Sequence, residues 1–99
     1  MNDIAPEILE RASQGDIGAF EEVYKACSRF VYHVALRVTR NSADAEEVTQ
    51  DVFMKIYRNL KDFKFRSAFR TWVYRVTVNT SINQYRKFRR EEGGRLDYD

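Results

Sequence analysis

Residues 16–38, DIGAFEEVYKACSRFVYHVALRV, contain the pattern that decides the fold. Apolar side chains recur there at steps of three and four, at Phe20, Val23, Tyr24, Cys27, Phe30, Val31, Val34, Ala35 and Val38. This spacing places them on one face of an α-helix. Asp16 is of the residue type that caps the N-termini of helices. The stretch therefore predicts an amphipathic helix that starts after Asp16, ends near Val38 and buries one face.

The flanking segments predict three further helices. A short one spans about Pro6 to Ser13, with proline at its start and Gly15 ending it. The next is capped by Asn41 or Ser42 and has an inward stripe of Ala45, Val48, Val52, Phe53, Ile56, Tyr57 and Leu60. After a loop over residues 61–66, Ser67 is expected to cap a last helix that reaches about Phe88. Its core candidates are Phe69, Trp72, Val73, Val76 and Thr80.

These elements together predict an all-α fold. No glycine or proline lies between Ala19 and Glu92, so the turns that a sheet requires are missing from the sequence. Three main helices and a short N-terminal one, joined by short connections, indicate a compact helical bundle over residues 1–90. The polar tail at residues 91–99, which contains Gly93-Gly94, is expected to begin a flexible interdomain linker.

Charge is distributed unevenly along the chain. Residues 63–90 contain eight basic side chains and no acidic one, whereas residues 1–62 contain eight basic and eleven acidic ones. This segregation predicts a polyanion as the partner of the C-terminal part and a different partner for the acidic part. A solvated basic helix face without a partner is the simpler alternative.

The last predicted helix interleaves aromatic and basic residues and also carries two amides. Asn79 and Asn83 are four residues apart, on one helical face. An amide presents both a donor and an acceptor, so it can match the edge of a base, while flat rings can stack on unpaired bases. The combination favours binding to a single nucleic-acid strand, although both asparagines could also simply face solvent.

Nothing in the sequence indicates an enzyme. His33 and Cys27 show no nucleophile or metal-ligand spacing. The acidic residues Asp44, Glu46, Glu47 and Asp51 spread around a helix rather than converge on an ion, so no metal or cofactor is expected. The sequence has no apolar run of about 20 residues and no signal peptide, and its cysteine is single. We therefore expect a cytoplasmic protein that does not insert into membranes.

Several linked motifs resemble the extracytoplasmic-function (ECF) sigma factors of bacterial RNA polymerase. The run DAEEVTQDVF at residues 44–53 is similar to that family's polymerase-binding helix, and FKFRSAFRTWVYRV at residues 63–76 to the loop and helix that follow. Val78-Asn79-Thr80, the basic run at residues 86–90 and GDIGAF at residues 15–20 continue the match. The resemblance spans about Ile8 to Arg90 and identifies the chain as region 2 of such a factor. It does not extend to the family's C-terminal region 4 domain.

The resemblance implies a function and residues that perform it. Region 2 of these factors binds the clamp helices of the largest polymerase subunit and recognises and opens the minus-ten promoter element on the non-template DNA strand. The implied polymerase-binding residues are Asp44, Glu47, Gln50 and Asp51. The implied DNA-binding residues are Lys64, Arg66, Ser67, Arg70, Arg75, Asn79, Asn83, Arg86, Lys87, Arg89 and Arg90. An anti-sigma factor is a further partner that the resemblance implies.

Two positions depart from the family's pattern. Phe65 stands in the loop where the family often has glycine, which changes the loop and affects base preference. The tryptophan pair that props open the duplex in housekeeping sigma factors is replaced by Arg75-Val76, which implies weaker melting. A helical module that binds a protein or an RNA through its basic helix remains the alternative function.

Overall fold

The computed structural model describes residues 3–63 and 68–96, and within them the side chains as far as Glu91. These residues form four α-helices, α1 (Pro6–Ser13), α2 (Ile17–Thr39), α3 (Ser42–Asn59) and α4 (Phe69–Leu96), and one 3-10 turn, η1 (Leu60–Asp62). No strand occurs in this part of the chain. The all-α prediction is confirmed, and the first three helices begin and end within about a residue of the predicted positions.

Local chemistry explains where these helices start and stop. Asp16 caps α2, because its carboxylate accepts a hydrogen bond of 3.0 Å from the Ala19 amide. Asn41 caps α3 in the same way, because its side-chain oxygen accepts a hydrogen bond of 3.0 Å from the amide of Asp44. Gly15 takes a φ of +94° after α1, a left-handed conformation that suits glycine. Ser67, the predicted cap of α4, lies outside the described residues.

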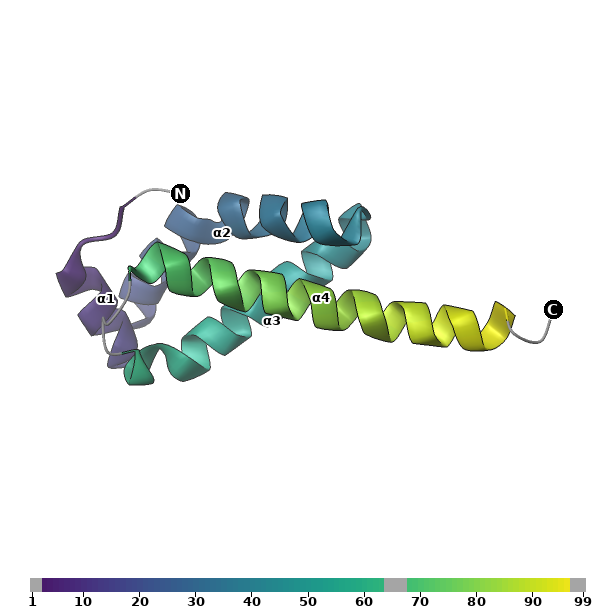
Figure 1. The fold of residues 1–99 in the computed structure, drawn as a ribbon. Helices are drawn as coiled ribbons and strands as arrows, with labels where there is room; N and C mark the ends of the chain where they lie inside the picture. Colours follow the sequence, from purple (N-terminus) through teal and green to yellow (C-terminus); the bar gives the residue numbers. More distant parts are fainter. Residues whose placement is uncertain (1–2, 64–67, 97–99) are drawn as a thin grey trace.

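The helices pack as an elongated bundle (Figure 1). In that view α2 and α4 run side by side, α3 crosses them, and α1 packs against α2 at one end. The molecule measures 56 × 23 × 22 Å, and the C-terminal part of α4 extends beyond the other helices. The fully enclosed side chains at the centre of the bundle include Val23, Cys27, Val31, Val48, Val52, Ile56 and Val73.

Two residues predicted to face inward do not. Tyr24 is 47% exposed and Tyr57 is 54% exposed. Both lie at the edge of the seam between α2 and α3, where Tyr24 packs its ring 4.7 Å from that of Phe53 and Tyr57 packs 5.2 Å from Phe20. A tyrosine at such an edge buries one side of its ring and keeps its hydroxyl in water.

Helix α4 differs from the sequence prediction at its end and on its inner face. It continues to Leu96, past the predicted end near Phe88. The arginine, lysine and glutamate residues up to residue 92 favour helix, which accounts for the extension as far as that residue. Its inner face also buries two hydroxyl residues that were not predicted, Thr77 and Ser81. Each donates a hydrogen bond of 2.7 Å to the carbonyl oxygen four residues before it, which satisfies the buried oxygen. Small side chains there bring the α4 backbone close to α2 and α3.

Candidate nucleic-acid and polymerase interfaces

The outer face of α4 presents a continuous polar stripe, which we call the α4 stripe. Its five members are all exposed, and each follows the previous one by three or four residues, the spacing of a single helix face: Arg75, Asn79, Asn83, Arg86 and Arg90. The opposite face of the helix holds the buried Val73, Thr77 and Ser81, so packing fixes the direction of the stripe. The two amides that the sequence singled out therefore lie between cations.

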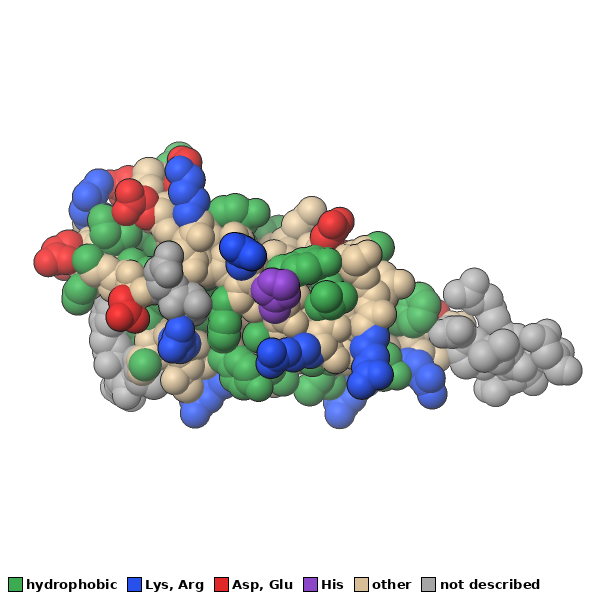
Figure 2. Space-filling model, turned by 90° about the horizontal axis from the view of Figure 1, so that it is seen from above, with side chains coloured by type: hydrophobic (Ala, Val, Ile, Leu, Met, Phe, Trp, Pro, Cys, Tyr) green, Lys and Arg blue, Asp and Glu red, His purple; other side chains and the backbone are tan. Residues whose placement is uncertain are grey.

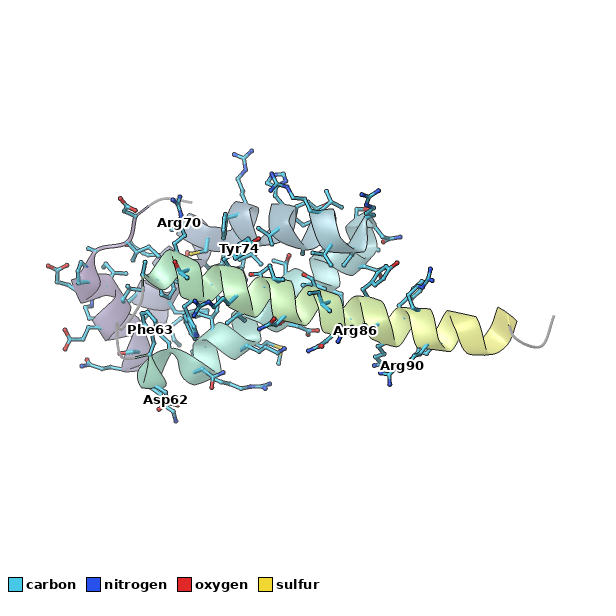
Figure 3. The ribbon with its side chains drawn as sticks, in the orientation of Figure 1. Asp62, Phe63, Arg70, Tyr74, Arg86 and Arg90 are labelled. Carbon is cyan, nitrogen blue, oxygen red and sulfur yellow. The ribbon has the colours of Figure 1, made fainter. Side chains whose placement is uncertain are left out.

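The other predicted DNA-binding residues lie around this stripe or outside the described residues. Lys87 and Arg89 are exposed on neighbouring faces of α4, and the Arg89 guanidinium lies 5.9 Å from the centre of the Tyr85 ring. Arg70 is exposed near the start of α4, and Figure 3 shows it far along the helix from Arg86 and Arg90. Lys64, Arg66 and Ser67, together with Phe65, are not described, so their predicted roles remain predictions.

An aromatic cluster lies at the start of α4. The rings of Phe63 and Trp72 are stacked with centroids 4.9 Å apart, and Phe69 lies 5.8 Å from Phe63 and 5.7 Å from Trp72. All three are partly buried against the core. The cluster packs Phe63, which follows η1, against the first turn of α4, and Trp72 takes part in the packing of the bundle.

The predicted polymerase-binding residues form an arc on α3. Glu47 and Gln50 are exposed, whereas Asp44 and Asp51 are half-buried. Gln50 also borders two neighbouring hollows between α2 and α3. One is lined mostly by residues with polar groups, among them Arg29, His33 and Glu46, and the other is mainly apolar and includes Phe20, Met54 and Tyr57.

The apolar part of this surface was missed from the sequence. Met54 is 52% exposed and lies beside Tyr24 and Tyr57, the two tyrosines that were predicted to be buried. The sequence did contain a signal for the exposure of the two tyrosines. Each lies at the margin of the apolar stripe of its helix, next to the polar face. The α3 surface therefore combines carboxylates, an amide and exposed apolar groups, a mixture typical of protein–protein contacts.

One functional candidate on α3 was also missed. Lys55 donates a hydrogen bond of 3.0 Å from Nζ to Oγ1 of Thr80 on α4, so a cation from the acidic helix reaches the side of the α4 stripe. Thr80 was predicted as a core residue, and it is 5% exposed. The sequence signal was the isolated lysine in a helix whose earlier charges are all acidic.

Other reactive groups do not converge on a site. Cys27 is fully buried, and burial raises the pKa of its thiol to about 11. His33 is exposed and meets the ring of Tyr32 at 5.7 Å. Within residues 3–63 and 68–96, no three histidine, cysteine, aspartate or glutamate side chains are grouped to hold a metal ion. Across the same residues, no helix has the length and apolar character to cross a membrane.

The surface around α2 is rich in basic groups. Figure 2 shows lysine and arginine side chains on several sides of the single histidine, with few acidic ones on that face. This arrangement favours an anionic partner on one side of the bundle.

Comparison with known proteins agrees with this geometry. The family model of Sigma-70 region 2 matches residues 23–91. The chain is 41% identical over 78 residues to the ECF RNA polymerase sigma-E factor of Escherichia coli (strain K12), a match covering 77% of this chain and 39% of that protein. It is 34% identical over 77 residues to the RNA polymerase sigma-H factor of Pseudomonas aeruginosa, covering 78% of this chain and 40% of that protein.

The chain spans about two fifths of the length of these curated relatives. Among solved structures, it is similar to an engineered region 2 of sigmaE in complex with GTAAAA, with a TM-score of 0.75 and 31% sequence identity, covering 88% of this chain and 97% of that one. The matched residues include α3 and the packed part of α4, which carry both candidate interfaces. This chain belongs to the Sigma-70 region 2 family.

Proposed function

We propose that this chain is the region 2 module of an ECF sigma factor, and that it takes part in transcription initiation rather than in catalysis. It binds core RNA polymerase through α3, at Asp44, Glu47, Gln50 and Asp51. It recognises the non-template strand of the minus-ten promoter element through α4. A polymerase partner places this activity in the cytoplasm. The α4 stripe carries the proposal, since it sets two amides between three arginines on one exposed helix face.

The stripe suits an opened strand better than a duplex. Arginines neutralise phosphates of any sequence, and the affinity they supply depends on salt. The amides of Asn79 and Asn83 offer donors and acceptors that can match the edge of an unpaired base. The similarity to a region 2 structure in complex with GTAAAA supports a single-stranded ligand of this type.

Two substitutions separate base reading from phosphate binding. Asn79→Ala is expected to change the order of preference among minus-ten variants, because it removes an amide that faces a base. Arg86→Ala is expected to weaken binding to every sequence alike and to lower the slope of log K against log salt by about 0.7. Both side chains are exposed, so folding should be preserved.

The measurement is fluorescence anisotropy with labelled single-stranded GTAAAA, its single-base variants and a scrambled strand, at several salt concentrations. The proposal predicts tighter binding of the wild-type chain to GTAAAA than to the scrambled strand. Equal, sequence-independent losses for both variants would contradict the division between Asn79 and Arg86.

Polymerase binding is tested on the α3 arc. Gln50→Ala combined with Asp51→Ala is expected to weaken association with core RNA polymerase, because an amide and a carboxylate that can pair with partner arginines are lost. The matched control removes an amide and a carboxylate elsewhere, with Gln14→Ala and Glu10→Ala at α1, both exposed. Pull-down with core polymerase is the readout, and equal recovery of the two double variants would count against the α3 assignment.

The alternative function, a helical module that binds protein or RNA, makes a different prediction. Such a module would bind RNA and DNA alike, with no preference for GTAAAA and no gain when polymerase core is added. An anti-sigma factor is a further expected partner, because ECF sigma factors are commonly held inactive by one. The exposed apolar residues Met54 and Tyr57 offer a surface that it could cover.

A further inference from the structure

Lys55 connects the helix assigned to polymerase with the helix assigned to DNA. Its Nζ donates to Oγ1 of Thr80 at 3.0 Å, and Oγ1 of Thr80 in turn donates to the carbonyl oxygen of Val76 at 2.7 Å. The hydroxyl proton of Thr80 is thus donated within α4, and a lone pair on the same oxygen accepts the hydrogen bond from the Lys55 ammonium. Because Thr80 is 5% exposed and packed, it is a fixed anchor for an otherwise flexible side chain.

The ammonium retains binding capacity beyond this contact. A lysine has three N–H donors, and Thr80 takes one. Among the side chains that the structure describes, Lys55 forms no ion pair, not even with Asp51, one turn before it on the same helix. Lys55 is itself exposed. A positive charge therefore stands at the surface, held in place and without a counter-ion.

The place where this charge stands is specific. Thr80 directly follows Asn79 and precedes Asn83 by three residues, so its hydroxyl brings the ammonium to the border of the α4 stripe, level with both amides. Lysine is a compact point charge that suits a phosphate, whereas amides suit base edges. Contacts to phosphates position a strand, and contacts to bases specify it.

We propose that Lys55 is a DNA-binding residue, which holds a backbone phosphate of the single strand whose bases face Asn79 and Asn83. The site for the opened strand then spans the seam between α3 and α4, and Thr80 is the positioning residue that aims the ammonium. This inference rests on the proposed DNA binding by α4 and adds to it a contact from the helix assigned to polymerase.

The first test compares two variants that each remove one positive charge. Lys55→Met is set against Lys25→Met on α2, whose ammonium lies 3.1 Å from Glu21 and away from the stripe. Binding to labelled single-stranded GTAAAA is measured by fluorescence anisotropy across salt concentrations. Lys55→Met should weaken binding roughly threefold to fivefold, as for one exposed ion pair. It should also reduce the slope of log K against log salt by about 0.7. Lys25→Met should change neither quantity appreciably.

The second test addresses positioning by Thr80. Thr80→Val removes the anchor and leaves the charge, so the affinity should fall less than with Lys55→Met while the salt slope is kept. In the double variant, Lys55→Met with Thr80→Val, binding should be no weaker than with Lys55→Met alone, because the threonine acts through the lysine. Thermal unfolding followed by circular dichroism shows that each variant is folded, and Lys55→Arg should retain the wild-type salt slope.

The outcomes separate this inference from the proposed function. If the wild-type chain binds GTAAAA and scrambled DNA equally, the proposed function fails and the role of Lys55 fails with it. If the wild-type chain is selective and Lys55→Met behaves like Lys25→Met, only the role of Lys55 is overturned. Losses that add in the double variant would overturn the positioning role of Thr80.

Discussion

At the scale of single residues, Asp16 has two partners that both favour its negatively charged form. Its carboxylate accepts the amide hydrogen of Ala19 at 3.0 Å and pairs with the Arg11 guanidinium at 2.9 Å. The hydrogen bond from Ala19 is the main reason that the pKa of Asp16 lies below its usual value of 3.8, and the bond from Arg11 adds to it. The residue thus joins the end of α1 to the start of α2.

Acid should therefore weaken this joint. Because the pKa of Asp16 is lower in the folded chain than in the unfolded one, its contribution to stability is complete above the unfolded value, near 3.8, and is lost as the pH falls through the folded value. Urea unfolding followed by circular dichroism, from pH 7 down to pH 3, should show a smaller loss of stability for Asp16→Asn than for the wild-type chain. Asp3→Asn, which removes an exposed carboxyl group, is the matched control. An identical pH dependence for wild type and Asp16→Asn would contradict this role.

At the scale of elements, the packing of α4 depends on small hydroxyl residues on its inner face. Thr77 and Ser81 are fully buried, and their oxygens bond within the helix rather than to a neighbour. The ring of Tyr74 on α4 lies 6.3 Å from that of Phe30 on α2 and closes the edge of this contact. The inner face therefore sets the distance between helices mainly through side-chain size.

Substitutions at Ser81 separate size from hydrogen bonding. Ser81→Ala should change the free energy of unfolding by no more than roughly 1 kcal/mol. The substitution removes only one of the donors to the Thr77 carbonyl oxygen, the hydroxyl of Ser81, and leaves the backbone of the helix in place. Ser81→Leu should destabilise by about 1–3 kcal/mol, since a larger side chain must push α4 away from its neighbours. Chemical denaturation measures both. A larger loss for alanine than for leucine would show that the hydroxyl, and not the volume, matters.

The features that the sequence predicted well depend on residues close together in the chain, and those that it missed depend on packing between helices. Helix caps at Asp16 and Asn41 depend on neighbours three residues away; Asp16 was predicted, and Asn41 was one of two predicted candidates. The exposure of Tyr24 and Tyr57 depends on where α2 meets α3, which periodicity within one helix does not contain. The bond from Lys55 to Thr80 joins residues 25 positions apart, so it became visible only with the packing of α3 against α4. The sequence predicted the cations and amides of the α4 stripe. The direction in which they face became known only once the structure showed which face of α4 is buried.

At the scale of the whole molecule, one thiol offers a probe of global opening. Cys27 is the single cysteine of the chain, it is fully enclosed among α2 neighbours and core residues, and burial raises its pKa to about 11. Both the burial and the protonated state protect it from alkylation, since the thiolate is the reactive form.

Labelling of Cys27 should therefore follow unfolding. At pH 8 without denaturant, iodoacetamide should react with the folded chain far more slowly than with glutathione. Across a urea titration, the labelled fraction should rise together with the loss of the circular-dichroism signal, as expected for cooperative unfolding of one core. Rapid labelling well before that transition would show that the core opens locally around α2.

The uninterrupted course of α4 has a consequence for distance. Arg75 and Arg90 are fifteen positions apart in one continuous helix, and at about 1.5 Å per residue this separation is about 22 Å. Such a continuous helix fixes the distance between the cations at its projecting end and the amides in the bundle, because no hinge between them lets one group shift relative to the other. It therefore acts as a ruler. One residue inserted between Asn83 and Arg86 would turn the far cations by about 100° and move them to another face. The length and phase of this ruler, and not only the chemistry of its side chains, then determine which phosphates and bases of a strand are met at the same time.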